Sequence, residues 1–588
     1  MNAMNEPAID QVTLVVLQNA LRQIVDEMDL TLERAAFNPI MSEGRDRANG
    51  IYDKATGDVI AQGATGLPIF VSVMQSAVKS VVAAFPDLEE GDIAMLNDPY
   101  CGGTHLMDVK LVKPFFYRGR KFCNFANCGH WLDIGGNVPG GFGIRATEII
   151  QEGVRIPPTL LYRRGRRRDG ILELLLANMR MPEQRLGDLQ AQIAALNVGE
   201  ERLRGLLDKY GFDEVQRHVD ELDRRAEQQM RAYISGIPDG AYRYETFLDS
   251  DGLVHEPIRV ALELRVQGDR LTLDFTGSSE PVRGPLNSAL SATTSASLVA
   301  LKHVFPEVPV NGGAFRPISV VVPENCFLNA KYPRAVSGAS AEVSLRVVDA
   351  IFGCLAQALP ERVPAACYGT VANLTISGYD PVRQRPYIMF RFSGGGYGGH
   401  AGGDGLLNGN APIGVSRTSP VEAMEQQYPL SFDYYRIRER SAGPGRMRGG
   451  LGVEFQLRLS DGSATSSVLA DRGKFAPFGL HGGGDGSLCE IEYTRGGAAY
   501  RPEHLTKDEG VEMAAGDTIR VAAPGGGGWG DPLARDPLRV LADVRLGYLS
   551  ADDALADYGV VIVAPPDGPQ QLDAEATAQR RRRRRGGV

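Results

Sequence analysis

The stretch that decides the fold of the N-terminal half is LNDPYCGGTHLMDVKLVKPFFYRGRKFCNFANCGHWLDIGG, Leu96–Gly136. Its two apolar runs, Val109–Phe116 and Lys121–Asn127, flank the polar turn YRGR, and this pattern predicts a β-hairpin. If the strands pair around that turn, residues whose numbers sum to about 237 face each other. His130 then lies opposite Met107 or Asp108, so the beginning and the end of the hairpin meet.

Two of the eight histidines lie at this end of the hairpin, and each is followed three residues later by an aspartate: His105 by Asp108, and His130 by Asp133. Facing residues of paired strands have Cβ atoms about 5 Å apart, so His105, Asp108 and His130 can converge if the segment GGTHL is a loop. Its two glycines allow such a loop. Two imidazoles and a carboxylate suit zinc, iron or manganese, with open positions for water or substrate.

The same stretch permits other interpretations. Asp133 is either a fourth ligand or the acceptor that fixes the tautomer of an imidazole. Each polar side chain could instead be an ordinary hydrogen-bonded residue at a hairpin end. A structural zinc site of Cys101, Cys123, Cys128 and His130 has less support, because the odd spacing of Cys123 and Cys128 sends them to opposite faces of a strand. Small buried cysteines are the expected alternative.

The composition excludes several classes of protein. A chain of 588 residues with 43% hydrophobic and 23% charged residues predicts a globular protein with more than one core. No apolar run reaches the roughly 18 residues of a membrane span, and the N-terminus has no secretory signal, so we expect a cytoplasmic protein without a membrane partner. Seven cysteines at wide spacing fit a reducing compartment rather than a disulfide framework. The net charge of −9 argues against a nucleic-acid partner, although six arginines form the run Arg580–Arg585.

Glycine is abundant, with 70 residues, but it forms no motif for binding nucleotides. The phosphate loop Gly-x4-Gly-Lys-Ser/Thr is absent, and no Gly-x-Gly-x-x-Gly opens a clear βαβ helix. Three clusters, SGGGYGGHAGGDG, HGGGDG and PGGGGWGD, instead predict turn-rich loops and close approaches of the backbone.

Hydrophobic periodicity predicts an α+β protein of several domains. We expect helices at residues 9–36 and 71–85, a charged helical pair at 182–233, and alternating strands after Gly236. The predicted domains are an N-terminal metal-binding α+β domain with a helical insertion (1–235), a β-rich domain with glycine-rich loops (236–535), a C-terminal helical hairpin (536–564) and a disordered arginine-rich tail (565–588).

At NDPYCGGTHLMD and HWLDIGG the chain resembles the hydantoinase B/oxoprolinase family, whose forms read Asn-Asp-Pro-Tyr-x-Gly-Gly-Thr-His-Leu-x-Asp and His-x-x-Asp-Ile-Gly-Gly. Further segments typical of the family follow in the expected order: ATEIIQEGVRIPPTLLYRRG, NGGAFRPISVVVPENCFLNAKYP, RERSAGPGRMRGGLGV and PGGGGWGDPLARDPLRVLADVRLGYLSADDALADYGVVI. The resemblance extends from about Asp10 to Val563, which is nearly the whole chain.

The resemblance implies the B-type subunit of an ATP-dependent amidohydrolase such as N-methylhydantoinase, 5-oxoprolinase or caprolactamase. Such a subunit works in a hetero-oligomer with an A-type subunit of actin-like ATPase fold, which binds ATP and magnesium. The B-type subunit holds a divalent metal (zinc, manganese or iron). The substrate is a small cyclic amide, which opens after the partner has phosphorylated it.

The resemblance also implies the roles of individual residues. The metal ligands that it implies are Asp46, His105, Asp108 and His130. The catalytic residues that we predict with it are His105, Asp108, His130 and Asp133. Asp46 comes from the segment SEGRD, in which Glu43 is the second choice, and Asp133 then supports a ligand. From the residues alone, Asp46 is equally well a turn carboxylate paired with Arg45 or Arg47.

The chain departs from the family pattern at two aromatic residues. Phe70 stands where many members have histidine, and Trp131 follows His130 where the commoner form has two histidines. The same family includes the metal-bearing subunits of acetone and acetophenone carboxylases. A ketone carboxylase that forms an enolate at the metal is therefore the alternative function, with Phe70 and Trp131 lining a less polar pocket. A third possibility is a non-catalytic scaffold in which a closed metal site holds the hairpin together.

Overall fold

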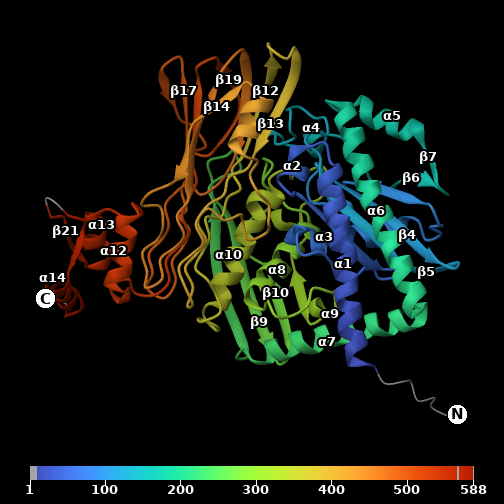
Figure 1. Ribbon diagram of the computed structural model, residues 1–588, viewed down its shortest axis with the longest axis horizontal. Helices are drawn as coiled ribbons and strands as arrows, with labels where there is room; N and C mark the ends of the chain where they lie inside the picture. The colour runs from blue at the N-terminus through green and yellow to red at the C-terminus, as the bar shows by residue number, and fades with distance from the viewer. Residues whose placement is uncertain (1–8, 566–567, 587–588) are drawn as a thin grey trace.

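The computed structural model describes residues 9–565 and 568–586. Its N-terminal part is built on a seven-stranded sheet with the strand order β2-β1-β5-β4-β3-β6-β7. The strands are β1 (Arg47–Asp53), β2 (Val59–Gln62), β3 (Ile93–Leu96), β4 (Asp108–Tyr117), β5 (Arg120–His130), β6 (Thr159–Arg163) and β7 (Arg166–Arg167). Helices α1 (Gln11–Ala35) and α6 (Pro182–Tyr210) pack against each other beside this sheet, and α3 (Pro68–Ala84) also packs on it (Figure 1).

The predicted hairpin is β4 and β5, and its register is confirmed. Asp108 faces His130 and Val109 faces Gly129, with one irregularity between Phe115 and Phe116. Side chains of even number in both strands point toward α3, where the ammonium of Lys110 lies 6.0 Å from the centre of the Phe70 ring. Side chains of odd number point toward α6, as for Asn127, which donates to the carbonyl oxygen of Gln192.

The helices that follow the first sheet separate it from a second one. Helix α8 (Leu290–Val304) packs on α3, and α10 (Ser344–Leu355) packs on both α8 and the second sheet. That sheet has the order β11-β10-β9-β8, formed by β8 (Gly240–Leu248), β9 (Ile258–Gln267), β10 (Arg270–Asp274) and β11 (Ile318–Val321). One hydrophobic core extends across the predicted domain limit at residues 235 and 236, which lies between α7 (Phe212–Ser235) and β8. The domain limits themselves remain a prediction.

A β-sandwich with its own core follows, at the top of Figure 1. Its two sheets have the orders β13-β12-β16-β19 and β14-β15-β20-β17-β18. The strands are β12 (Asn373–Asp380), β13 (Arg385–Arg391), β14 (Leu430–Ile437), β15 (Val453–Leu459), β16 (Ser463–Leu469), β17 (Glu490–Arg495), β18 (Ala498–Tyr500), β19 (Lys507–Ala514) and β20 (Thr518–Ala522). Helices and mostly antiparallel sheets are thus combined in several layers, in agreement with the mixed class that the sequence predicts.

The glycine clusters form extended segments that run side by side between the C-terminal helices and the body (orange in Figure 1). The amide of Gly396 donates to the carbonyl of Pro524, and the amide of Gly527 donates to the carbonyl of Ala366. A Cβ atom on Gly396 would lie 1.8 Å from the carbonyl oxygen of Gly450, which no real side chain permits. The close approach of the backbone was expected, but its form is a bundle of hydrogen-bonded segments rather than a set of isolated turns.

The C-terminal part has a small core of its own. It contains the expected helical hairpin, α12 (Pro537–Arg545) and α13 (Ala551–Tyr558), followed by β21 (Val561–Val563), β22 (Gln571–Asp573) and α14 (Ala574–Gly586). The predicted disorder of residues 565–588 is wrong for residues 571–586; residues 566–567 and 587–588 lie outside the described residues. Asp573 caps α14 by accepting from the amide of Ala576, and Arg581 of the arginine run donates to the carbonyl of Tyr558.

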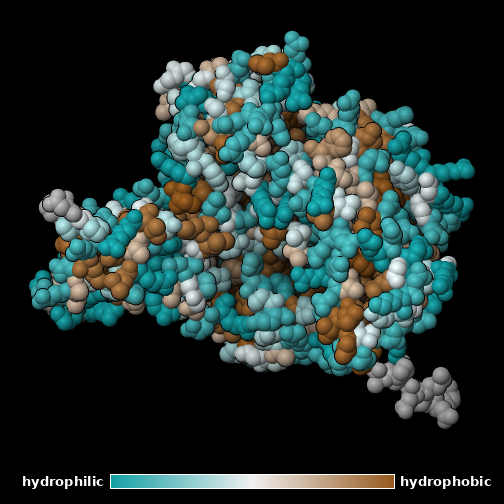
Figure 2. Space-filling view, in the orientation of Figure 1, coloured by the Kyte–Doolittle hydropathy of each residue, from teal (hydrophilic) through white to brown (hydrophobic). Residues whose placement is uncertain are grey.

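The surface agrees with the composition. Figure 2 shows hydrophilic side chains over most of one face, with hydrophobic patches scattered among them. Within residues 9–565 and 568–586, no helix is both long enough and apolar enough to cross a membrane.

Candidate metal centre

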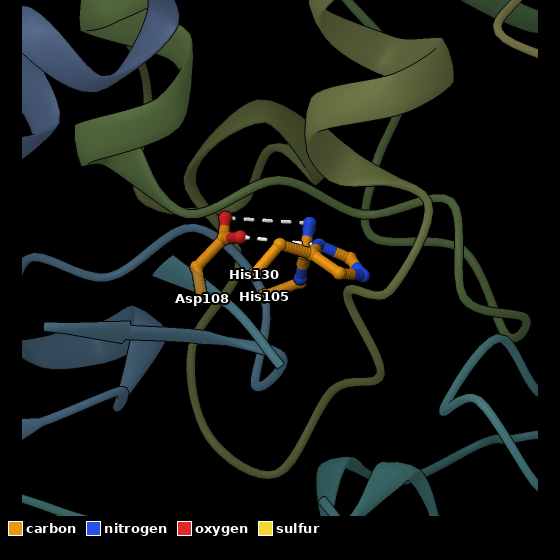
Figure 3. Close-up of side chains that lie close together, drawn as sticks. All are labelled: His105, Asp108 and His130. Carbon is orange, nitrogen blue, oxygen red and sulfur yellow. Dashed lines mark ion pairs between the residues drawn. The ribbon is translucent and has the colours of Figure 1, made fainter. Parts of the chain in front are cut away.

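Three of the predicted site residues form a row across the first sheet. Asp108 on β4 faces His130 on β5, and the pairing of Arg47 with Gly129 places Asp46 next to His130 on the other side. Asp108 Oδ1 lies 3.4 Å from His130 Nδ1, and Asp46 Oδ2 lies 3.6 Å from the same nitrogen. His105 reaches the row from the preceding loop, with its Nε2 3.3 Å from Asp108 Oδ2 (Figure 3). The sheet register therefore explains how Asp46 and Asp108, which are 62 positions apart in the sequence, both come to lie beside His130.

The backbone around Asp46 and His130 is fixed by a buried asparagine. Asn38 caps the short helix α2 (Pro39–Ser42) by accepting from the amide of Ile40, and its Nδ2 donates to the carbonyl oxygen of His130 at 2.7 Å. After α2 the chain turns through Arg45, whose φ is 58°, and the amide of His130 donates to the carbonyl of Asp46. A single side chain thus ties the segment before β1 to the end of β5.

Among the residues that the structure describes, no arginine pairs with Asp46. Arg45 pairs with Glu33 of α1, and Arg47 pairs with Glu33 and with the buried Asp29. The alternative in which Asp46 is a turn carboxylate neutralised by one of its neighbours is therefore wrong. Glu43, the second choice in the same segment, does not line the cavity beside the cluster.

His105 lies in a loop that requires glycine. Gly102 has a φ of 92°, and a Cβ atom there would lie 2.5 Å from the backbone carbon of Ser76. After the turn, Thr104 donates from its hydroxyl to Asp108 Oδ2, and Lys110 donates from its ammonium to the carbonyl oxygen of Asp108 at 3.1 Å. These contacts orient the Asp108 carboxylate toward the two imidazoles.

Burial and neighbouring charges shift the pKa values of the four cluster residues in different directions. Burial raises the pKa of Asp46 to about 6, and the Asp108 carboxylate adds to the rise. Burial also lowers the pKa of His105 to about 4. For Asp108 the effect of burial is outweighed by His105, His130 and Lys110, which hold its pKa well below the usual range. Burial lowers the pKa of His130, but Asp46 and Asp108 outweigh it, so this pKa lies above the ordinary value.

The cluster fits a divalent metal ion by the chemistry of its donor atoms. His105 Nδ1, Asp108 Oδ1 and His130 Nδ1 are buried, and none of them has a hydrogen-bond partner within the described ranges. Buried polar atoms without partners are rare and call for an explanation, such as an ion. One ligand atom from each of these residues lies within 4.8 Å of the others. Within residues 9–565 and 568–586, no other group of three or more such side chains meets this condition.

The cluster opens onto a small cavity of about 60 Å³, here called the metal cavity. Phe70 of α3 lines it, as do Phe142, Phe390 and Phe392. The His130 ring stacks on Phe390 and Phe142, with ring centres 5.5 Å and 6.1 Å away. Asn373 at the start of β12 also lines the cavity, and its buried Nδ2 has no partner among the residues that the structure describes. Apart from Phe70, sequence reasoning missed these residues.

Asp133 lies apart from both imidazoles. Its carboxylate accepts from the amides of Gly135, Gly140 and Arg180 and pairs with the Arg180 guanidinium at 3.0 Å. None of its hydrogen bonds within the described ranges reaches His105 or His130, so the geometry supports neither a ligand role nor a tautomer-fixing role. Its contacts instead hold the loop after β5 in place.

Two further expectations have a clear outcome. Trp131 donates from its indole nitrogen to Gln192 of α6 and does not line the metal cavity.

All seven cysteines are unpaired, and Cys123 and Cys128 are buried on opposite faces of β5. Burial raises the pKa of both thiols well above the ordinary value, as expected of small apolar residues.

The sequence pattern of the hydantoinase B/oxoprolinase family matches residues 10–532. The chain belongs to this family. It is 33% identical to the beta chain of caprolactamase from Pseudomonas jessenii, over 97% of the chain and 98% of that protein. It is 31% identical to a protein of Pseudomonas sp. strain NS671 that is named as the B component of a D-/L-hydantoinase, over 98% of each.

Solved structures share the fold. The crystal structure of ATP-dependent caprolactamase from Pseudomonas jessenii matches with a TM-score of 0.88 and 31% identity, over 98% of this chain and 100% of that chain. Nucleotide-free acetone carboxylase matches with a TM-score of 0.89 and 21% identity, over 98% and 83%. The second match indicates a common fold only.

Proposed function

We propose that the chain is the metal-bearing B-type subunit of an ATP-dependent enzyme that opens a cyclic amide and works with an A-type ATPase subunit. The observation that carries the proposal is the buried cluster of His105, Asp108 and His130, whose ligand atoms lack partners beside a cavity. Relatives named as caprolactamase and as a hydantoinase component support the hydrolysis of cyclic amides. The absence of a phosphate loop from the sequence fits a partner that binds ATP and magnesium.

In this proposal Asp46, His105, Asp108 and His130 hold a zinc, manganese or iron ion. When bound, the ion supplies Lewis acidity to the carbonyl group of the substrate. The aromatic rings of Phe142, Phe390 and Phe392 keep bulk water from the site, which strengthens electrostatic interactions there. Asn373 donates a hydrogen bond from Nδ2 to an oxygen of the substrate and so positions the amide.

The test is ATP turnover by the chain purified with its A-type partner, measured with hydantoins, lactams, 5-oxoproline and ketones, with and without bicarbonate. The proposal predicts turnover that a cyclic amide stimulates without bicarbonate, and loss of that turnover in His105→Ala. A His105→Ala variant that kept both its bound metal and its amide-coupled turnover would sink the proposal.

A second candidate is the metal-bearing subunit of an ATP-dependent ketone carboxylase. The observation that favours it is the apolar wall of the metal cavity, which includes Phe70. In this alternative the same ligands would hold the ion, which would supply Lewis acidity to the carbonyl oxygen of a ketone. Ketone-stimulated turnover that requires bicarbonate, with incorporation of labelled bicarbonate into the product, would select it.

A further inference from the structure

Two buried polar side chains line the metal cavity in addition to the proposed ligands. The polar residues there that are not proposed ligands are Ser340, Asn373, Asn410 and Ser416. Asn410 and Ser416 are partly exposed, so both can bond to water. Ser340 and Asn373 are only 7% and 3% exposed, and no described residue bonds to Ser340 Oγ or Asn373 Nδ2. These two atoms therefore have hydrogen bonds left for a molecule in the cavity.

Ser340 lies in a π-helical turn. The turn spans Ala339–Val343 and continues into α10, and the amide of Ser344 donates to the carbonyl of Ala339, five residues earlier. Such turns are rare and occur frequently at functional sites, because the wider turn changes where its side chains lie. The local backbone thus marks the same serine that the cavity does.

Other buried serines of the neighbouring helices bond to the backbone instead. Ser344 of α10 donates from Oγ to the carbonyl of Ala339 at 3.0 Å, and Ser297 of α8 donates to the carbonyl of Thr293 at 2.9 Å. A bond to the preceding turn is the usual way in which a helix satisfies a serine. The Ser340 hydroxyl makes no such bond to a described residue, so a ligand in the metal cavity can supply its partner.

The size of the metal cavity fits a small ring. One water needs about 10–15 Å³, so a cavity of about 60 Å³ holds about four to six water-sized groups, which is comparable with a five-membered lactam. In so small a ring the amide is cis, so its carbonyl oxygen and its N–H hydrogen lie on the same edge. In an open-chain amide, which is trans, they lie on opposite edges. A donor and an acceptor in one small cavity complement the edge of the lactam.

We propose that Ser340 bonds the ring nitrogen of a cyclic amide and so selects substrates whose amide nitrogen carries a hydrogen. This inference rests on the proposed function for the nature of the substrate. Asn373 donates to the carbonyl oxygen, and the Ser340 hydroxyl accepts from the N–H group. Lactams and hydantoins with a free N–H group are therefore substrates, and lactams alkylated on that nitrogen are poor ones.

A hydroxyl also suits the phosphorylated form of the substrate. In the proposed function the γ-phosphoryl group of ATP is transferred to the amide oxygen, ADP leaves, and the N–H proton passes to water. The ring then holds a C=N bond, and its nitrogen is an acceptor rather than a donor. The Ser340 hydroxyl is both a donor and an acceptor, so it rotates and donates to that nitrogen.

A matched pair of probes tests the contact with the ring nitrogen. 2-Pyrrolidinone and cyclopentanone have rings of the same size and a carbonyl group, and the N–H group of the first is a methylene group in the second. Binding of each to the full chain is measured by ligand-observed NMR and titration calorimetry, for the wild type and for Ser340→Ala. The variant should bind 2-pyrrolidinone at least about tenfold more weakly and cyclopentanone within about twofold of the wild type, because only the lactam loses a hydrogen bond.

Three results would overturn the proposal. Equal losses for the two probes would mean that Ser340 contacts the carbonyl group or shapes the cavity. Unchanged binding of 2-pyrrolidinone in Ser340→Ala would mean that the hydroxyl does not contact it. A wild type that binds no 2-pyrrolidinone would show that the cavity does not take a lactam.

Ser297→Ala is the matched control. It removes a buried serine hydroxyl that bonds to the backbone of α8, and Ser297 does not line the metal cavity. This variant should bind both probes as the wild type does. In denaturant unfolding, Ser340→Ala should be at least as stable as the wild type, because it removes a hydroxyl that has no described partner. A marked loss of stability in Ser340→Ala would assign the hydroxyl to the fold and contradict the proposal.

The binding assay separates this inference from the proposed function. If amide-coupled turnover fails but Ser340→Ala selectively loses 2-pyrrolidinone, the contact with Ser340 stands and the proposed chemistry falls. If turnover succeeds and Ser340→Ala changes neither the binding of the lactam nor its KM, the proposed function stands and the role of Ser340 falls.

Discussion

Replacing Asn38 by alanine should loosen the metal centre without removing any ligand. The variant loses the cap of α2, which is worth about 1 kcal/mol, and leaves the buried carbonyl of His130 without its donor, which costs about 1–3 kcal/mol. The expected loss is therefore about 2–4 kcal/mol of stability. Because His130 depends on this contact for its backbone position, metal affinity should fall by about 10- to 100-fold.

Asn311 is a matched control for this prediction. It caps the four-residue helix α9 (Gly312–Phe315) by accepting from the amide of Ala314, and its Nδ2 donates to the carbonyl of Leu222. Asn311→Ala removes the same two kinds of hydrogen bond away from the centre. It should lower stability by a similar amount and leave metal affinity unchanged.

The assay combines denaturant unfolding with metal content after equilibration against a competing chelator. Asn38→Ala and Asn311→Ala should unfold at similar denaturant concentrations, but only Asn38→Ala should lose metal. Equal metal affinity in the two variants would refute the argument that Asn38 positions His130.

Three further predictions follow from single residues. Gly396→Ala should lower the free energy of unfolding by more than about 4 kcal/mol, because the added Cβ atom would collide with backbone atoms. Gly170→Ala is the control: its Cβ atom would meet nothing within 4 Å, so this variant should be as stable as the wild type or slightly more stable. Similar losses of stability in the two variants, measured by denaturant unfolding, would contradict this prediction. Burial raises the pKa of Glu152 to about 7 from an ordinary 4.5, so the folded protein binds the carboxyl proton more tightly than the unfolded chain does. The contribution of Glu152 to stability therefore falls as the pH rises from about 4.5 to about 7. Glu152→Gln should remove a slope of up to about 1.4 kcal/mol per pH unit, measured by unfolding at pH 5 and pH 8; an unchanged slope would contradict the assignment. Asn373→Ala should lower kcat/KM for the cyclic amide by about tenfold or more with metal content unchanged, and a wild-type value would exclude Asn373 from positioning substrate.

The sequence predicts the part of the site that depends on local pairing. The turn YRGR sets the register of β4 and β5 to within one residue, and that register places Asp108 opposite His130. Loop glycines before His105 explain why an odd spacing still brings it to the same cluster. These inferences need only the period of a strand and the conformational freedom of glycine.

The rest of the centre depends on contacts between distant segments. Asp46 comes to His130 because β1 pairs with β5, and nothing local in SEGRD encodes that pairing. Phe390 and Asn373 come from the edge of a sandwich more than 240 residues downstream of His130. The spacing His-x-x-Asp occurs twice and suggested a similar place for Asp133, but after β5 the chain leaves the sheet and this carboxylate pairs with Arg180.

Contacts between distant segments also explain why the predictions for the glycine clusters and for the arginine-rich C-terminal segment differ from the structure. Glycine-rich sequence indicates close approach of the backbone but does not specify which segments approach, and here they come from clusters about 130 residues apart. The arginine run has a composition typical of disorder, yet Asp573 caps a helix there and Tyr558 accepts from Arg581.

The most direct test of the central claim is anomalous X-ray scattering from crystals of the chain purified without chelators. The account predicts one strong peak at the cluster, about 2.0–2.3 Å from nitrogen atoms of His105 and His130 and from a carboxylate oxygen of Asp108. A fully active protein with no peak at this cluster, or with its metal bound elsewhere, would contradict the account.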